Sequence, residues 1–385
     1  MTNIQSKVPQ LRFPEFSGEW SRFKLDELCS DFKSGNGITA ESIKKNGLYP
    51  VYGGNGLRGF SDEYTHNGEY VLIGRQGALC GNINRISGSA FVSEHAVVVG
   101  ENKLSSIDWL ENKLKAMNLG KYSESSAQPG LAVGRLKSLK TFAPDKKEAI
   151  KMSFFHSTVD KKISLLKQKQ EKLVLYKKGI MHRLFSQQLR FKNDNGQDFP
   201  NWKRVCLGDF ITVRKGEAVT EEMPLHSLTI KNGIEPKSAR YVRDFLVNDT
   251  SEAYKVVLPG DFAMNPMNLR FGAIARHSGD RKVLLSKYYD VFYFNDELDH
   301  EFMELYLKSY GMICFYNKMA TGTLEEKKRV HFSDLIKFRR LLPCYSEQKR
   351  IAGILRIINQ KINLTQQQIE QTQAYKQGLI QQMFV

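Results

Sequence analysis

The sequence predicts an α+β protein in which one plan occurs twice: a small β-rich domain followed by one long helix. Residues 144–185 recur as residues 343–384 with roughly one position in four identical, whereas roughly one in seventeen would match by chance. Both stretches carry a heptad pattern, and the residues before each are rich in glycine and β-forming side chains. We therefore expect a first domain at 1–143, a first long helix at 144–187, a second domain at 188–342 and a second long helix at 343–385.

The two helices should pair with each other as an antiparallel coiled coil. A helix of some forty residues is about 60 Å long, too long for the core of an ordinary domain, and it needs a partner along its length. Residues spaced alternately four and three apart form the expected seam. In the first helix these are Val159, Ile163, Leu166, Gln170, Leu173, Lys177, Ile180 and Leu184, and in the second Ile358, Ile362, Thr365, Ile369, Thr372, Lys376, Leu379 and Met383. The two seam lysines either extend out of the seam or set its register.

The domains also begin alike. Five pairs recur at an offset of 182: Trp20/Trp202, Arg22/Arg204, Leu25/Leu207, Glu27/Asp209 and Lys33/Lys215. Strands are predicted at 70–73, 90–92, 96–99, 262–264, 272–275 and 291–294, and helices at 106–117 and 301–317. Each domain finishes with a hydrophobic strand that runs into a proline, at 139–144 and 338–343. We expect each domain to hold a mixed or antiparallel sheet.

Charge and cysteine usage limit the classes of function. The formal charge of +16 favours a polyanionic partner. Between Lys146 and Arg190, twelve Lys and Arg face three acids, a net of +9; a solvated face and a channel floor against duplex DNA are both compatible with this excess. Five scattered cysteines favour a reducing cytosol over a disulfide framework or zinc cluster. No signal peptide or membrane span is apparent, so we expect a cytoplasmic protein.

No motif predicts a catalytic or metal site in this chain. Residues 54–59 match G-x-G-x-x-G, but a proline-containing stretch precedes them and no helix follows, so a glycine-rich surface loop is preferred over a dinucleotide site. Residues 265–268, NPMN, resemble the start of an amino-methyltransferase tetrad but lack the second proline and the aromatic residue. The histidines are more simply explained as surface or core residues than as ligands.

Basic and amide residues interleaved with glycines and aromatics predict nucleic-acid contacts in both domains. Arg and Lys can bind guanine or phosphate, and Asn and Gln match adenine; taken singly, each is more often a solvated surface residue, and only the two sets together favour nucleic-acid binding. The candidates in the first domain are Lys33, Arg58, Arg75, Gln76, Asn82, Asn84, Arg85, Ser93 and His95. Those in the second are Lys215, Asn265, Asn268, Arg270, Arg276, Arg281, Lys282, Ser286, Lys287 and Tyr288.

The whole chain resembles the specificity subunit of a type I restriction–modification enzyme. The resemblance rests on the repeated Trp-x4-Leu-x-Asp/Glu segments, on Glu148 and Glu347 in the proline-led helix starts, and on glycines near both helix ends. It implies two target-recognition domains that each read one half of a bipartite, asymmetric DNA target, with the helices setting the gap. It also implies that catalysis belongs to partners, namely two methyltransferase subunits and a translocase–endonuclease. S-adenosylmethionine, ATP and Mg would then bind to those partners and no cofactor to this chain.

Two other classes of function stay open. One is a non-enzymatic coiled-coil scaffold whose two domains bind proteins. The other is a self-sufficient modification enzyme, which would need the cofactor loop and catalytic tetrad that the sequence lacks. A DNA affinity that falls steeply with salt would argue against the scaffold.

Overall fold

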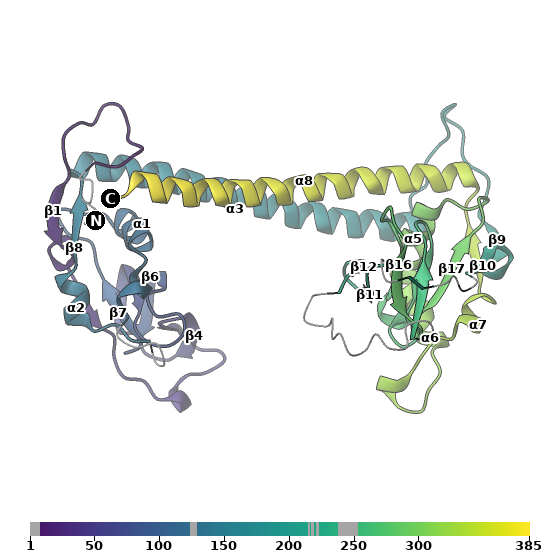
Figure 1. The fold of residues 1–385 in the computed structure, drawn as a ribbon, viewed down its shortest axis with the longest axis horizontal. Helices are drawn as coiled ribbons and strands as arrows, with labels where there is room; N and C mark the ends of the chain where they lie inside the picture. Colours follow the sequence, from purple (N-terminus) through teal and green to yellow (C-terminus); the bar gives the residue numbers. More distant parts are fainter. Residues whose placement is uncertain (1–7, 124–128, 215, 217–218, 221–222, 238–252) are drawn as a thin grey trace. The chain divides into compact units, whose positions relative to one another are not determined.

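The chain folds into two compact units. The first is built from two separate stretches of the sequence and the second from one continuous stretch. A computed structural model describes residues 8–123, 129–214, 216, 219–220, 223–237 and 253–385. The first unit comprises Met1–Gln168 with Thr365–Val385, and the second comprises Lys169–Leu364. The long helices α3 (Lys146–Phe185) and α8 (Tyr345–Met383) each contribute to both units (Figure 1). The division into four parts expected from the sequence stays a prediction.

The first and last strands of each domain pair with one another. Strand β1 (Ser21–Lys24) is antiparallel to β8 (Lys140–Ala143), and β9 (Lys203–Cys206) is antiparallel to β18 (Arg339–Leu342). A 3-10 turn follows each first strand, η1 (Leu25–Leu28) and η4 (Leu207–Phe210), and buries its leading leucine completely. The repeated Trp-x4-Leu segment is therefore a strand and turn that close the domain against its own exit strand.

The first domain is built on a six-stranded mixed sheet in the order β2-β7-β5-β6-β3-β4. Only the β3–β6 pair is parallel. The strands are β2 (Phe32–Ser34), β3 (Tyr49–Gly53), β4 (Gly56–Ser61), β5 (His66–Gly74), β6 (Ile83–Val92) and β7 (Ala96–Val99). The helices are η2 (Ala40–Ser42), α1 (Ile107–Met117), η3 (Leu119–Tyr122) and α2 (Val133–Ser138).

The second domain repeats the central part of this sheet. Its four-stranded antiparallel sheet has the order β10-β17-β14-β15, which corresponds strand for strand to β2-β7-β5-β6. These strands are β10 (Ile211–Val213), β14 (Phe262–Met264), β15 (Ile274–Arg276) and β17 (Asp290–Phe294). Two further pairs are β11 (His226–Thr229) with β12 (Gly233–Pro236) and β13 (Tyr254–Val257) with β16 (Val283–Ser286). The helices are η7 (Leu269–Phe271), α5 (His300–Leu307), α6 (Tyr310–Met319), η8 (Glu325–Lys327) and α7 (Phe332–Leu335).

Three local predictions are wrong. The helix expected at 301–317 is two helices, because the Ser309 hydroxyl accepts the Met312 N–H and starts a new N-terminus. The strand expected at 272–275 begins only at Ile274, since Gly272 has a φ of 93° and closes a turn. The glycine-rich stretch 54–59 is not a loop throughout, because Gly56–Ser61 is strand β4 of a hairpin.

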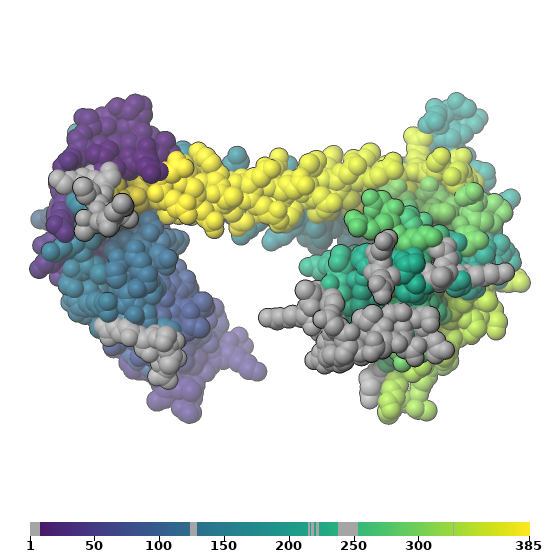
Figure 2. Space-filling view, in the orientation of Figure 1, coloured from purple at the N-terminus to yellow at the C-terminus, as the bar shows by residue number. Residues whose placement is uncertain are grey.

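Each domain shares its hydrophobic core with both long helices. In the first unit Val159 and Ile163 of α3 lie in one cluster with Leu379 and Met383 of α8 and with Trp109. In the second unit Leu184 of α3 shares a cluster with Ile351 and Ile358 of α8 and with Trp202. The N-terminal segment also lies on the end of α8, where the Leu11 N–H donates to the Gln382 carbonyl (Figure 2).

Burial along the helices follows the expected seam. The seam residues Val159, Ile163, Leu166, Leu173, Ile180, Leu184, Ile358, Ile362, Ile369, Leu379 and Met383 are all buried or half-buried. In the first unit Lys376 of α8 pairs with Asp160 of α3, with its Nζ 2.6 and 2.7 Å from the two carboxylate oxygens. The second seam lysine, Lys177, is half-buried.

Candidate nucleic-acid interface

In the first unit, three connections of the sheet meet where β5 ends and β7 begins. Gly74 and Ala96 are register partners, the Arg75 N–H donates to the His95 carbonyl at 2.9 Å, and His95 Nδ1 lies 2.7 Å from Gln76 Oε1. The β3–β4 turn joins them, because Asn84 Nδ2 donates to the Gly54 carbonyl at 3.4 Å. These contacts gather polar side chains from distant parts of the sequence at one end of the sheet.

The second unit has the same arrangement where β14 ends and β17 begins. Met264 and Asp290 are register partners there. Asn265 follows β14 directly, and its Oδ1 accepts the Met267 N–H at 3.0 Å, which fixes the following turn. Lys287 and Tyr288, in the turn that leads into β17, are exposed. The segments 265–273 and 287–289 thus correspond to 75–82 and 93–95 of the first unit.

We call these two corresponding regions the strand-end surfaces. Several candidates on them are exposed or half-exposed, which leaves them accessible to a ligand. In the first unit these are Gln76, Asn82, Asn84 and His95, and in the second Asn265, Asn268, Ser286, Lys287 and Tyr288. Lys33 on β2 and Arg58 on β4 are also exposed. Their roles as DNA contacts stay predictions.

Three arginines among the predicted DNA contacts form salt bridges with carboxylates that are distant in the sequence but lie in the same domain. Arg85 has Glu69, Asp108 and Glu111 around it. Burial acts to lower the pKa of the Arg85 guanidinium, but its hydrogen bonds to Asp108 and Glu69 outweigh burial and raise it. A cation neutralised in this way is a poor reader of bases. The other two, Arg270 and Arg276, pair with Glu325 and Glu304 respectively.

Two further candidates are less accessible to a ligand. Ser93 is fully buried, so a direct contact with DNA is excluded in this conformation. Arg75 is half-buried, and it donates to the Leu131 carbonyl at 3.3 Å and to Ser34 Oγ at 3.0 Å, which ties the loop before α2 to β2.

The remaining candidates lie away from the strand-end surfaces or outside the described residues. Arg281 and Lys282 are exposed but belong to the connection that follows Arg276. Arg276 pairs with Phe262, at the opposite end of β14 from Asn265. The candidates of the second domain are therefore not one patch. Lys215 lies outside the described residues.

A repeated clamp, which the sequence analysis did not identify, attaches each domain to the start of a long helix. Arg12 Nε and Nη2 each lie 2.7 Å from an oxygen of Glu148 on α3, and the Trp20 indole donates to the same carboxylate at 3.2 Å. In the second unit Arg190 and Trp202 hold Glu347 of α8 in the same way. The repeated Leu-Arg-Phe at 11–13 and 189–191 was the available signal.

Within the described residues, no group of three or more His, Cys, Asp or Glu is arranged to hold a metal ion. Burial raises the pKa of the Cys29 thiol to about 12, with a smaller contribution from Asp26. None of the described helices combines the length and apolarity needed to cross a bilayer.

Comparison with known proteins finds relatives of the first part of the chain. The family described as "Type I restriction modification DNA specificity domain" matches residues 17–175. Residues 17–175 therefore match a domain of the type I restriction–modification specificity proteins. The chain is 47% identical over 138 residues to the specificity subunit of the type I restriction enzyme EcoprrI of Escherichia coli, an alignment that covers 35% of this chain. The chain spans about a third of the length of the curated relatives that it matches.

Solved structures share the fold along nearly the whole chain. The S subunit of a type I restriction–modification system from M. genitalium matches with a TM-score of 0.58 and 14% identity, over 98% of this chain and 99% of that one. A chain from a study of complex assembly and conformational transition of the type I R-M system matches with a TM-score of 0.57 and 15% identity, over 95% and 97%. At these identities the likeness concerns the fold.

Proposed function

We propose that this chain is the DNA-reading, non-catalytic subunit of a type I restriction–modification complex, in which each globular domain reads one half of a bipartite target. The observation that carries the proposal is the pair of strand-end surfaces, which the same strand order presents in both units. Because their side chains differ, with Gln76 and His95 on one and Asn268 and Tyr288 on the other, the two half-sites should differ. The net charge of +16 suits binding to DNA phosphates.

The long helices would pair antiparallel and set the distance between the half-sites. The Asp160–Lys376 ion pair supports this direction, because it joins the first half of α3 to the last half of α8. Half-sites on DNA commonly lie about one helical turn, roughly 34 Å, apart. In this proposal the helix pair acts as a spacer whose length fixes the unread gap.

The helices would also dock two methyltransferase subunits. Two pairs of residues that are identical between the helices are also largely exposed: Leu165 (55%) with Leu364 (58%), and Tyr176 with Tyr375 (57% each). Leu165 and Tyr375 belong to the first unit, and Tyr176 and Leu364 belong to the second. Of these four residues, each unit therefore presents one leucine and one tyrosine, as two copies of the same partner would require.

A methylation map tests the reading function. The chain is co-expressed with its methyltransferase subunit in a host without DNA methylation, and modified adenines are located by sequencing. We expect a bipartite, asymmetric motif with a fixed gap that disappears when this chain is omitted. Methylation unchanged by the omission, with DNA binding insensitive to salt, would favour the scaffold alternative instead.

Native mass spectrometry of the purified complex tests the docking surface. Replacing Tyr176 and Leu364 with Glu should leave one methyltransferase subunit bound, and adding Leu165→Glu and Tyr375→Glu should remove the second. Phe154→Glu is the matched control, because Phe154 is exposed on α3 but has Gly353 as its counterpart. Two subunits retained by the fourfold variant would contradict the assignment of this surface.

A further inference from the structure

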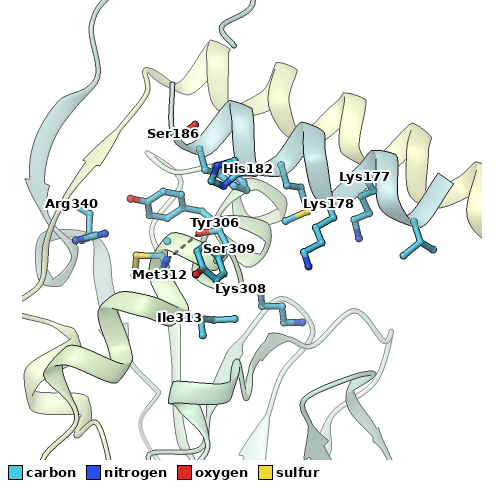
Figure 3. A pocket seen from close by; sticks show the side chains of 15 residues that line it. Lys177, Lys178, His182, Ser186, Tyr306, Lys308, Ser309, Met312, Ile313 and Arg340 are labelled. Carbon is cyan, nitrogen blue, oxygen red and sulfur yellow. Dashed lines mark hydrogen bonds between the residues drawn. The ribbon is translucent and has the colours of Figure 1, made fainter. Parts of the chain in front are cut away.

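The second unit contains a half-enclosed cavity that the proposed function does not use. Its volume is about 740 Å³, and it lies between α3 and the α5–α6 connection (Figure 3). Met181 of α3 and Ile313 of α6 line it, and the rings of Phe185 and Tyr306, which contact each other with centroids 5.5 Å apart, close one part of it. This volume falls in the range of about 300–1,000 Å³ that is typical of pockets for small molecules.

The same cavity is lined by an excess of positive charge. Lys177, Lys178 and His182 line it from α3, and Lys308 and Arg340 from the other side; Lys177 and Lys178 extend toward Lys308 (Figure 3). Among the described residues, no carboxylate lies within salt-bridge distance of Lys177. Burial, and then the charge of Lys308, lower the pKa of Lys177 against the weaker opposing effect of Glu304. A cation in such a place is stabilised when an anion joins it.

The first unit shows that the shared fold does not require this charge. Lys376, the counterpart of Lys177, has Asp160 as its partner at 2.6 Å. The residue that corresponds to Asp160 in the second unit is Asn359, which cannot neutralise Lys177. The counterpart of Lys178 is likewise neutral, Gln377. The second unit therefore has one more lysine at these positions than the first, and the carboxylate at the position of Asp160 is absent.

Arg340 adds a donor on the side of the cavity away from the lysines. Its guanidinium lies over the Phe315 ring at 4.1 Å, which fixes its plane. Its buried Nε has no hydrogen-bond partner among the described residues. A buried donor of this kind is costly unless a ligand or water accepts its hydrogen bond.

We propose that this cavity binds a small organic anion with a flat apolar body and a phosphate or carboxylate head. The body would lie between Met181 and Ile313, against the contacting Phe185 and Tyr306 rings. The head would lie near Lys177 and Lys178, where charge-assisted hydrogen bonds replace the missing carboxylate, while Lys308 keeps its salt bridge to Glu304 at 3.2 Å. A half-enclosed pocket suits a small ligand better than the backbone of duplex DNA, which needs an open surface. The inference is independent of the proposed reading function.

Calorimetric titration of the full-length chain with AMP tests the proposal. We expect AMP to bind at least tenfold more tightly than adenosine, which lacks the charge, or inorganic phosphate, which lacks the body. Lys177→Gln should weaken AMP binding about tenfold, as the loss of one charge-assisted contact predicts. Lys172→Gln is the matched control, because Lys172 is exposed on the same helix and does not line the cavity; it should bind AMP as the parent does.

A second variant separates occupation of the cavity from general attraction of anions. Ile313→Trp fills the apolar side without changing any charge, and it should abolish AMP binding while phosphate binding is unchanged. The proposal is overturned if AMP does not bind at about 5 mM, if Lys172→Gln weakens binding as much as Lys177→Gln, or if duplex DNA displaces AMP stoichiometrically. Thermal unfolding of each variant establishes that the fold is retained.

Discussion

Removing the carboxylate of the first clamp should destabilise the first unit strongly. Glu148 is 1% exposed and Arg12 14% exposed, so Glu148→Ala leaves a poorly hydrated guanidinium and the Trp20 indole N–H without their acceptor. Breaking a buried ion pair costs about 3–5 kcal/mol, and the partial exposure of Arg12 argues for the lower end, about 3 kcal/mol. For a unit of this size, each kcal/mol corresponds to about 2–4 °C in Tm. The expected decrease is therefore about 6–12 °C.

Differential scanning calorimetry of the full-length chain measures this change. Glu148→Gln keeps the shape and one acceptor oxygen, so it should lower the Tm by less than Glu148→Ala. Glu171→Ala removes an exposed carboxylate from the same helix and should change stability by no more than about 0.5 kcal/mol. Glu347→Ala should act on the second unit through Arg190 and Trp202. If the two units unfold in separate transitions, the Glu148 and Glu347 variants should shift different ones.

The result that refutes this reasoning is a Glu148→Ala variant no less stable than Glu171→Ala. It would mean that Arg12 and the indole find water or other acceptors at no cost. A loss of stability equal in Glu148→Gln and Glu148→Ala would also contradict the clamp, because the amide retains an acceptor for one of the two donors.

Three further predictions concern the helices. Burial, and then the charge of Lys376, lower the pKa of His156 to about 4, against the opposing effect of Asp160. Because this folded-state pKa lies below the ordinary value near 6.5, the protein loses stability as the pH falls from 6.5 toward 4. The total loss should be about 3 kcal/mol. Urea unfolding at both pH values measures this loss, which His156→Leu should abolish, because Leu355 occupies the corresponding position of α8. Asn359→Asp should stabilise the second unit by about 0.5–1 kcal/mol by pairing with Lys177; an unchanged or lower Tm would show that the two do not meet. Deleting the heptad 166–172 removes about 10.5 Å of helix, so the gap of the methylated motif should shorten by about three base pairs or methylation should cease, and altered half-sites would contradict the spacer proposal.

The repeat made much of this fold predictable from one sequence. The heptad steps identified residues that prove to be buried or half-buried along both helices, because a regular period leaves little freedom in which side faces inward. The strands at 139–144 and 338–343 were also found, since each hydrophobic stretch ends at a proline that cannot continue the ladder. The helix break at Ser309 was missed, because the helical spacing of apolar residues continues past this position in the sequence. The break comes from the Ser309 hydroxyl, which accepts a local backbone hydrogen bond and starts a new helix.

The candidate site was less predictable than the fold, because residue type does not reveal which partners the fold supplies. Arg85 and Gln76 look equally suitable for binding DNA in the sequence. The structure places three carboxylates around Arg85 and leaves Gln76 exposed beside His95. Glu69, Asp108 and Glu111 come from a strand and a helix whose relation to Arg85 depends on tertiary packing, and no local pattern records it.

The division of the first unit between distant stretches has a consequence for its synthesis. Its core includes Trp109 and Val159 together with Leu379, Met383 and Phe384. Ribosomes add about 5–20 residues per second, so the last of these side chains appears roughly 10–45 s after residue 168 has been made. The second unit, Lys169–Leu364, is complete before then. The domain translated first is therefore the last to finish folding, and until then its unfinished core depends on chaperones or on its own partial structure for protection from aggregation.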